Sequence, residues 1–102
     1  MAVLYVAEFV TVGGTGNYVV AGAQVAPVAE QTIVISGSST PVTNPFNANT
    51  AFVRVHTDAI CSIAFGTNPT ATVSKMRMSA NQTEYFSVPL GANYKIAVIS
   101  NT

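Results

Sequence analysis

Short runs of β-branched and aromatic residues alternate along this chain with stretches of Gly, Pro, Asn and Ser, and this alternation constrains the fold most strongly. The runs favour extended strands, whereas the stretches between them contain residues that accept a positive φ or lack a backbone N–H donor. A series of short strands joined by such turns is typical of a sandwich or barrel. We therefore predict an all-β fold, a small β-sandwich of about 7–8 short antiparallel strands.

The predicted strands are spread along the whole chain. They lie at Val3–Thr11, Tyr18–Ala21, Thr32–Ser36, Ala51–His56, Ile60–Phe65, Ser74–Met78, Tyr85–Val88 and Tyr94–Ile99. A helix over Val73–Tyr85 is the one helical alternative, and β-branched Val73, two serines and Asn81 weaken it. VGGTGN at 12–17 is predicted to be a turn, and SGSSTPVTNPFNANT at 36–50 a long exposed loop.

Alternation within the strands predicts which side chains face the core. Val53 and Val55 point one way and Phe52, Arg54 and His56 the other, because side chains reverse at every residue of an extended chain. The valine side is predicted to face the core, as are Ile33, Ile35, Ile96 and Val98. Several strands carry apolar residues on both sides, which is expected when one face meets the core and the other a partner.

The length of 102 residues allows one domain with a single two-layer core, which we assign to residues 1–102. The apolar opening segment suggests a second use for residues 1–12. They could form a strand or arm that is exchanged with a neighbouring molecule, adding to an exposed sheet edge.

Charged residues make up only 8% of the chain, where a typical soluble domain has about 25%. Four acids and four bases leave a formal net charge of zero, whereas Thr, Ser, Asn and Gln together contribute 31 residues. Protein interfaces are similarly depleted in Lys, Glu and Asp, because uncharged groups are more easily desolvated. The composition thus favours a molecule that is covered by neighbours in an assembly; the alternative is a free monomer with an unusually neutral surface.

Several classes of partner are not expected. The bases Arg54, Lys75, Arg77 and Lys95 are scattered, so no basic patch for nucleic acid is predicted. No apolar run reaches the length of a membrane span. The opening MAVLYVAEFV lacks the positive region of a signal peptide, so the protein is expected to stay where it is made. A single cysteine forms no internal disulfide.

The stretch RVHTDAICSIAFG places His56, Asp58 and Cys61 close together in sequence, which raises the question of a catalytic site. A cysteine nucleophile needs a base within hydrogen-bond reach. On a strand, His56 and Asp58 lie roughly 7 Å apart, and Cys61 is expected on the next strand as a small buried side chain. A structural zinc site normally needs four ligands and a catalytic one three, and the chain has no other His or Cys to complete the set. We expect no enzyme activity, no metal site and no cofactor.

Two further patterns are interpreted structurally. GGTG at 13–16 is followed by another predicted strand rather than a helix, so it is not expected to bind phosphate. Asn81-Gln82-Thr83 matches a glycosylation acceptor, which matters only in a secreted protein, and is predicted to be a turn.

Aromatic side chains are enriched at interface centres, and a place in the core is the alternative for them. Tyr85 and Phe86 are adjacent and point to opposite faces, so one is expected in the core and the other exposed. The candidate interface residues are Val3, Tyr5, Phe9, Arg54, His56, Arg77 and Tyr85.

Residues 52–100 contain a group of local features: the Arg54–Asp58 strand end, the Cys61 strand leading to Gly66–Ala71, the Met78–Asn81 turn, Glu84–Phe86 and a closing strand Ile96–Ile99. With these features, nearly the whole second half resembles small structural proteins encoded among the virion genes of tailed bacteriophages. No catalytic signature is among them, and the first half adds little to the resemblance.

The resemblance implies a small β-sandwich of jelly-roll type that sits on the outer capsid as a decoration or cement protein. Its partners would be the major capsid protein and further copies of itself, as a dimer or trimer. Its location would be the virion capsid, after synthesis in the bacterial cytoplasm. The alternative is a tail- or fibre-associated module that binds receptor glycans, for which Tyr85, Tyr94, Asn93 and Asp58 are the candidate residues.

Overall fold

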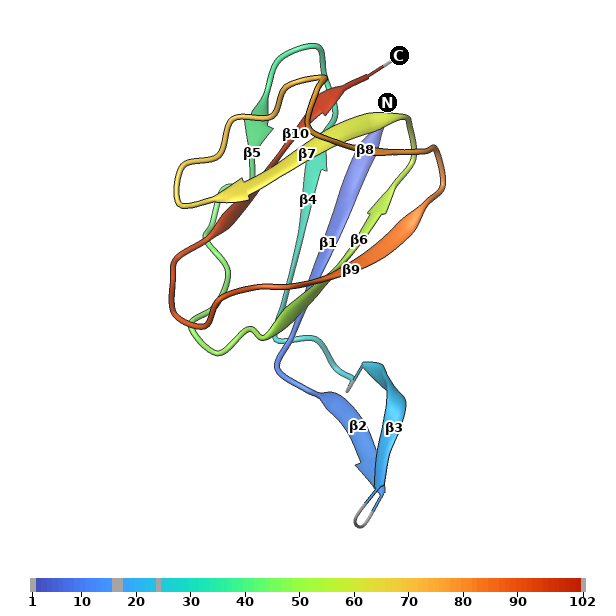
Figure 1. The fold of residues 1–102 in the computed structure, drawn as a ribbon, viewed down its shortest axis with the longest axis vertical. Coiled ribbons are helices and arrows are strands. Elements are labelled where there is room, and N and C mark those ends of the chain that lie inside the picture. Colours follow the sequence, from blue (N-terminus) through green and yellow to red (C-terminus); the bar gives the residue numbers. More distant parts are fainter. Residues whose placement is uncertain (1, 16–17, 24, 102) are drawn as a thin grey trace.

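The computed structural model describes the backbone of residues 2–15, 18–23 and 25–101, and the side chains of residues 2–11 and 25–101. These residues form ten strands and no helix. Eight of the strands make two antiparallel sheets of four, and the other two pair as a hairpin (Figure 1). The predicted all-β sandwich is confirmed; the jelly-roll type stays an expectation.

The strand order mixes distant parts of the chain. The first sheet consists, in order, of β4 (Ala29–Val34), β1 (Val3–Phe9), β6 (Phe52–Thr57) and β9 (Thr83–Ser87). The second sheet consists of β5 (Thr40–Pro41), β10 (Lys95–Ser100), β7 (Cys61–Gly66) and β8 (Met76–Met78). The hairpin of β2 (Val12–Thr15) and β3 (Tyr18–Ala23) lies at one end of the molecule (Figure 1).

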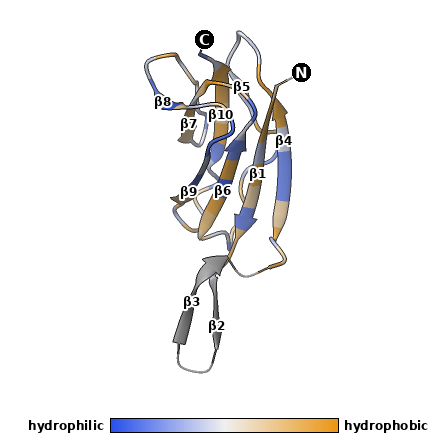
Figure 2. Ribbon diagram, turned by 90° about the vertical axis from the view of Figure 1, so that its right-hand side faces the viewer, coloured by the Kyte–Doolittle hydropathy of each residue, from blue (hydrophilic) through white to orange (hydrophobic). Residues whose placement is uncertain are grey.

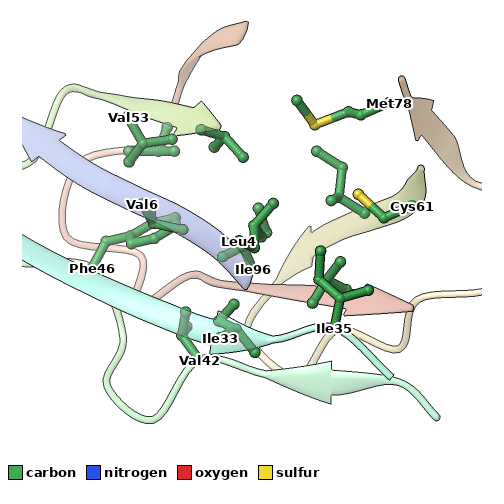
Figure 3. Packing of buried hydrophobic residues seen from close by; sticks show 14 residues of the cluster. Leu4, Val6, Ile33, Ile35, Val42, Phe46, Val53, Cys61, Met78 and Ile96 are labelled. Atoms are coloured by element: carbon green, nitrogen blue, oxygen red, sulfur yellow. The ribbon is translucent and has the colours of Figure 1, made fainter. Parts of the chain in front are cut away.

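The core lies between the two four-stranded sheets and is built from the inward side chains of both. Its members include Leu4, Val6, Ile33, Val53, Val55, Cys61, Ile63, Met78, Ile96 and Val98. Figure 3 shows how these side chains, from strands of both sheets, gather in one cluster. Burying one such aliphatic side chain contributes about 1.5–3 kcal/mol relative to leaving it exposed.

The predicted alternation is confirmed in the strands that carry it. Val53 and Val55 are fully buried, whereas Phe52, Arg54 and His56 are half-buried on the other side of β6. The predicted inward residues of β10 and of the segment at 33–35 are also buried: Ile33, Ile35, Ile96 and Val98. Tyr85 is exposed and its neighbour Phe86 packs against the core, as the opposite faces of adjacent residues require.

The predicted turn at 12–17 is wrong in its first part, because Val12–Thr15 forms strand β2. The β2–β3 pairing shifts register between Val12 and Gly14, and such irregularities are common where glycine occurs in a strand. Residues 16 and 17 of the predicted turn, like residues 1 and 102 of the predicted domain, lie outside the described residues.

The predicted long exposed loop at 36–50 is also partly wrong. Thr40–Pro41 forms the short edge strand β5, a position that tolerates a proline. Val42 and Phe46 are buried in the core, and the N–H of Val42 donates to the carbonyl of Ile96 at 2.9 Å. The tract is polar in composition, but its two apolar side chains attach it to the sandwich.

The helical alternative over Val73–Tyr85 is excluded by the structure. Strand β8 belongs to the second sheet and β9 to the first, so residues 79–82 must carry the chain from one sheet to the other. Asn81 makes this turn with a φ of 61°, a conformation that asparagine tolerates better than most residues. The side chain of Gln82 accepts a hydrogen bond from the N–H of Ser79 at 2.7 Å and closes the turn.

The opening segment occupies an interior position of the first sheet. Strand β1 pairs with β4 on one side and with β6 on the other, along its whole length. Residues 3–9 therefore have the chain's own strands at both edges, and an exchange with a neighbour would have to replace this pairing. The exchange of residues 1–12 stays a prediction. No helix that could cross a membrane occurs in the described ranges.

Candidate functional site

Six of the seven candidate interface residues lie on one surface, the side of the first sheet that points away from the core. The reason is strand register, because residues directly opposite each other on paired strands share a face. We call this surface the outer face; it consists of Val3, Tyr5, Ala7, Phe9, Glu30, Thr32, Val34, Phe52, Arg54, His56, Thr83, Tyr85 and Ser87. Glu30 and Arg54 are its charged residues.

The seventh candidate, Arg77, lies elsewhere. It is on β8 in the second sheet, opposite Ser62 of β7. The structure thus separates Arg77 from the other candidates by the thickness of the sandwich. No local sequence pattern could have shown this separation, because it depends on which sheet each strand joins.

Aromatic rings form a continuous row along one end of the outer face. Phe9 and Phe52 are stacked, with ring centroids 5.3 Å apart and an interplanar angle of 17°. Phe52 is followed by Tyr85 at 6.3 Å, tilted by 49°. Phe9 is buried, but Tyr85 is 57% exposed. Such pairs contribute about 0.5–1.5 kcal/mol beyond their area, so the row is a rigid apolar surface.

His56 lies further along the same face and is held in place by two neighbours. Its Nδ1 is 2.8 Å from the hydroxyl oxygen of Thr83, across the β6–β9 pair. Its ring centroid is 6.2 Å from that of Tyr5. These contacts orient the imidazole as part of the surface.

A depression of about 410 Å³ opens in the middle of the outer face. Ala7 lies there with Glu30 of β4 on one side and Arg54 of β6 on the other, because both residues pair with Ala7. Tyr5, Thr32 and His56 contribute to its wall. The depression exists because the small alanine is surrounded by larger side chains.

Ala7, Glu30 and Phe52 belong to this surface and were not among the candidate residues. The alternation along β6 was sufficient to find Phe52, since it shares a side with Arg54 and His56. Ala7 and Glu30 become recognisable only when β1 is known to lie between β4 and β6.

The three residues of RVHTDAICSIAFG are not brought together. Cys61 is fully buried on β7 in the second sheet, whereas His56 lies on the outer face of the first. Asp58 is exposed in the turn that follows β6, and its N–H donates to the carbonyl of Val3 at 3.2 Å. No group of three His, Cys, Asp or Glu side chains that could hold a metal occurs among the described residues.

The surroundings of Cys61 are those of a core residue. Burial raises the pKa of its thiol above the usual 9.0, and the hydrogen bond to Thr57 partly opposes this shift. The sulfur lies 3.5 Å from the Thr57 hydroxyl oxygen. A raised pKa disfavours the thiolate, which is the reactive form of cysteine.

The residues considered for glycan binding are dispersed. Tyr85 is on the outer face, and Asp58 is in the turn after β6. Asn93 and Tyr94 precede β10 of the second sheet, where Asn93 has a φ of 58° and the Tyr94 carbonyl accepts from the Phe46 N–H at 2.8 Å. Tyr94 packs against the core cluster.

Comparison of the whole chain with known protein families, with curated proteins and with solved structures finds no match.

Proposed function

We propose that this chain is a structural protein of a tailed-bacteriophage virion, which binds the outer surface of the capsid as a decoration or cement protein and stabilises the shell. In this role it would contact the major capsid protein and further copies of itself. The resemblance of residues 52–100 to virion structural proteins supports the assignment to a virion.

The outer face is the observation that carries the proposal. A sheet face of a free domain is normally solvated by charged side chains, but this face bears Val3, Val34, Tyr5, an aromatic row and only two charged residues. Contiguous apolar surface of this kind is typical of an interaction site. Neutral, shape-fitted contacts of this kind between copies of the chain would contribute to the stability of a shell in which the chain occurs many times.

The test is reconstitution on capsids. Purified capsids that lack the chain are incubated with it, and occupancy is measured by cryo-EM and by the stoichiometry of sedimented particles. We expect density on the outer capsid surface at symmetry positions between capsomers, and a higher temperature for DNA release from decorated particles. Isolated tails from the same phage serve as the control.

Binding to tails but not to capsids would replace the proposal by the tail- or fibre-associated alternative, and glycan-array binding by the isolated protein would support that alternative further. A chain that sediments with neither capsids nor tails would refute a role as a virion component.

A further inference from the structure

The charges of the outer face have a symmetry that indicates what covers it. Glu30 and Arg54 lie in one row across the sheet, on either side of Ala7. Neighbouring strands are about 4.8 Å apart, so each charged residue is displaced by the same distance from the middle strand β1, in opposite directions. Among the described residues neither Glu30 nor Arg54 forms an ion pair.

A two-fold axis that runs parallel to β1 above Ala7 exchanges these two positions. It places Glu30 of one copy opposite Arg54 of the other, and Arg54 opposite Glu30. Two equivalent ion pairs then form across the interface, which is the self-complementarity that a two-fold interface requires. We infer that the outer face binds the outer face of a second copy of this chain, in a two-fold dimer held in register by reciprocal Glu30–Arg54 pairs.

The shape of the outer face is compatible with this two-fold dimer. Two sheets that pack face to face are about 10 Å apart, and long side chains in the middle of the contact would normally hold them further apart. Here the depression of about 410 Å³ over Ala7 gives the Glu30 and Arg54 side chains of both copies room to meet between the sheets. Tyr5 lies beside the same axis, where the two tyrosines of the dimer can contact each other.

The alternative occupants of this face fit the charge pattern less well. A strongly acidic or basic partner would leave one of the two charges opposite a like charge, which disfavours binding. A second copy neutralises both. This inference rests on the proposed function only for the expectation of self-association, and it can be tested in solution without any capsid.

The experiment is a charge exchange followed by sedimentation velocity. The wild-type chain is expected to be a dimer. Glu30→Arg places two arginines opposite each other at both pairs, and Arg54→Glu places two glutamates there. Each variant alone is expected to dimerise more weakly by a factor on the order of 10 or more.

Mixing provides the decisive measurement. In an equimolar mixture of Glu30→Arg and Arg54→Glu, every pair across the interface again joins opposite charges, so we expect a heterodimer. The double variant Glu30→Arg/Arg54→Glu is expected to dimerise with itself. Circular dichroism of each single variant checks that it remains folded, and both residues lie on the surface of the sheet.

Arg77→Glu is the matched control, because it makes the same change of charge on the second sheet. It should leave the dimer intact. A wild-type chain that is monomeric or trimeric, single variants that dimerise like wild type, or a mixture that fails to restore the dimer would overturn the inference. A dimer that behaves as expected but binds no capsid would instead refute only the proposed function.

Discussion

Glu8 is an acidic side chain buried in a mainly apolar core. It lies on the inward side of β1, in line with Leu4 and Val6, and is only 1% exposed. In Figure 2 hydrophilic parts of β1 and β4 stand out within otherwise hydrophobic strands. A buried carboxylate requires hydrogen-bond donors, and the connection before β6 provides them.

The Oε1 atom of Glu8 accepts hydrogen bonds of 2.7 Å from the Asn47 N–H and from the Thr50 hydroxyl. Glu8→Ala leaves both donors without this acceptor. Loss of the partner costs about 1–3 kcal/mol for a buried group such as the Thr50 hydroxyl, and less for the part-buried N–H of Asn47. We expect the free energy of unfolding to fall by about 3 kcal/mol in urea denaturation. Glu8→Gln retains an acceptor oxygen and should lose less.

Glu84→Ala serves as the control for this prediction, because Glu84 is exposed on β9 and its loss should change stability by less than about 0.5 kcal/mol. If Glu8→Ala were as stable as Glu84→Ala, the hydrogen bonds of Glu8 would not be stabilising the connection at 47–50.

Cys61 allows a prediction about pH. Burial raises the pKa of its thiol in the folded protein above the value in the unfolded chain, so the folded state retains its proton to higher pH. The contribution of Cys61 to stability is therefore complete below about pH 9 and is lost as the pH rises from there towards the folded pKa. The difference in unfolding free energy between the wild type and Cys61→Ala should shrink over that range.

A thiol-specific reagent gives an independent measurement. At pH 8 the native protein should react only as fast as it unfolds, whereas denaturant should make Cys61 react at the rate of a free thiol. Fast labelling of the native protein would contradict the buried position of the sulfur.

At the scale of the strands, periodicity predicted the fold where the side chains alternate clearly. In β6 the two valines and their polar neighbours showed both the strand and its inward face. β5 and β2 were missed, because a two-residue edge strand with a proline and a strand of VGGT carry no alternation. For the same reason the tract that contains Val42 and Phe46 was predicted to be exposed throughout.

Periodicity does not predict which strands pair with each other, and the physical reason is a different one. The partners of β1 come from residues 29–34 and 52–57, so its neighbours are determined by contacts between distant parts of the chain. The outer face depends on those partners. Each strand could be given an inner and an outer side from the sequence, but the row of Glu30, Ala7 and Arg54 requires the register of three strands.

Substitutions on the two sides of strand β10 test how differently those sides are buried. Ile96 is fully buried between the sheets, and Ile99, on the same strand, is half-buried on the opposite side. Ile96→Ala should lower the free energy of unfolding by about 2–5 kcal/mol, since it removes buried methyl groups and leaves a cavity. Ile99→Ala removes the same atoms and should cost clearly less. Equal losses in chemical denaturation would show that β10 is buried equally on both sides.

At the scale of the whole molecule, the low charge content and the outer face have one common explanation. A free domain with zero net charge and a neutral, aromatic sheet face would tend to associate without order. A single acid and a single base at matched positions provide the order, since they favour one arrangement of two copies over the others. The two charges thus specify the contact, and the apolar side chains around them contribute most of its stability.

The shape of the dimer follows from this contact. The monomer measures 47 × 26 × 21 Å with a radius of gyration of 13.8 Å, and β1 runs roughly along its long axis (Figure 1). A two-fold axis parallel to β1 sets the long axes side by side with the centres about 20 Å apart, which gives a dimer radius of gyration of about 17 Å. Association end to end would separate the centres by about the 47 Å length of the monomer. The radius of gyration of such a dimer would be about 27 Å. Small-angle X-ray scattering should therefore show a radius near the lower value for the wild type and for the mixture of Glu30→Arg with Arg54→Glu. Either variant alone, at the same concentration, should give a smaller radius, closer to that of the monomer. A wild-type radius near the higher value would place the contact at the ends of the molecule, away from the outer face.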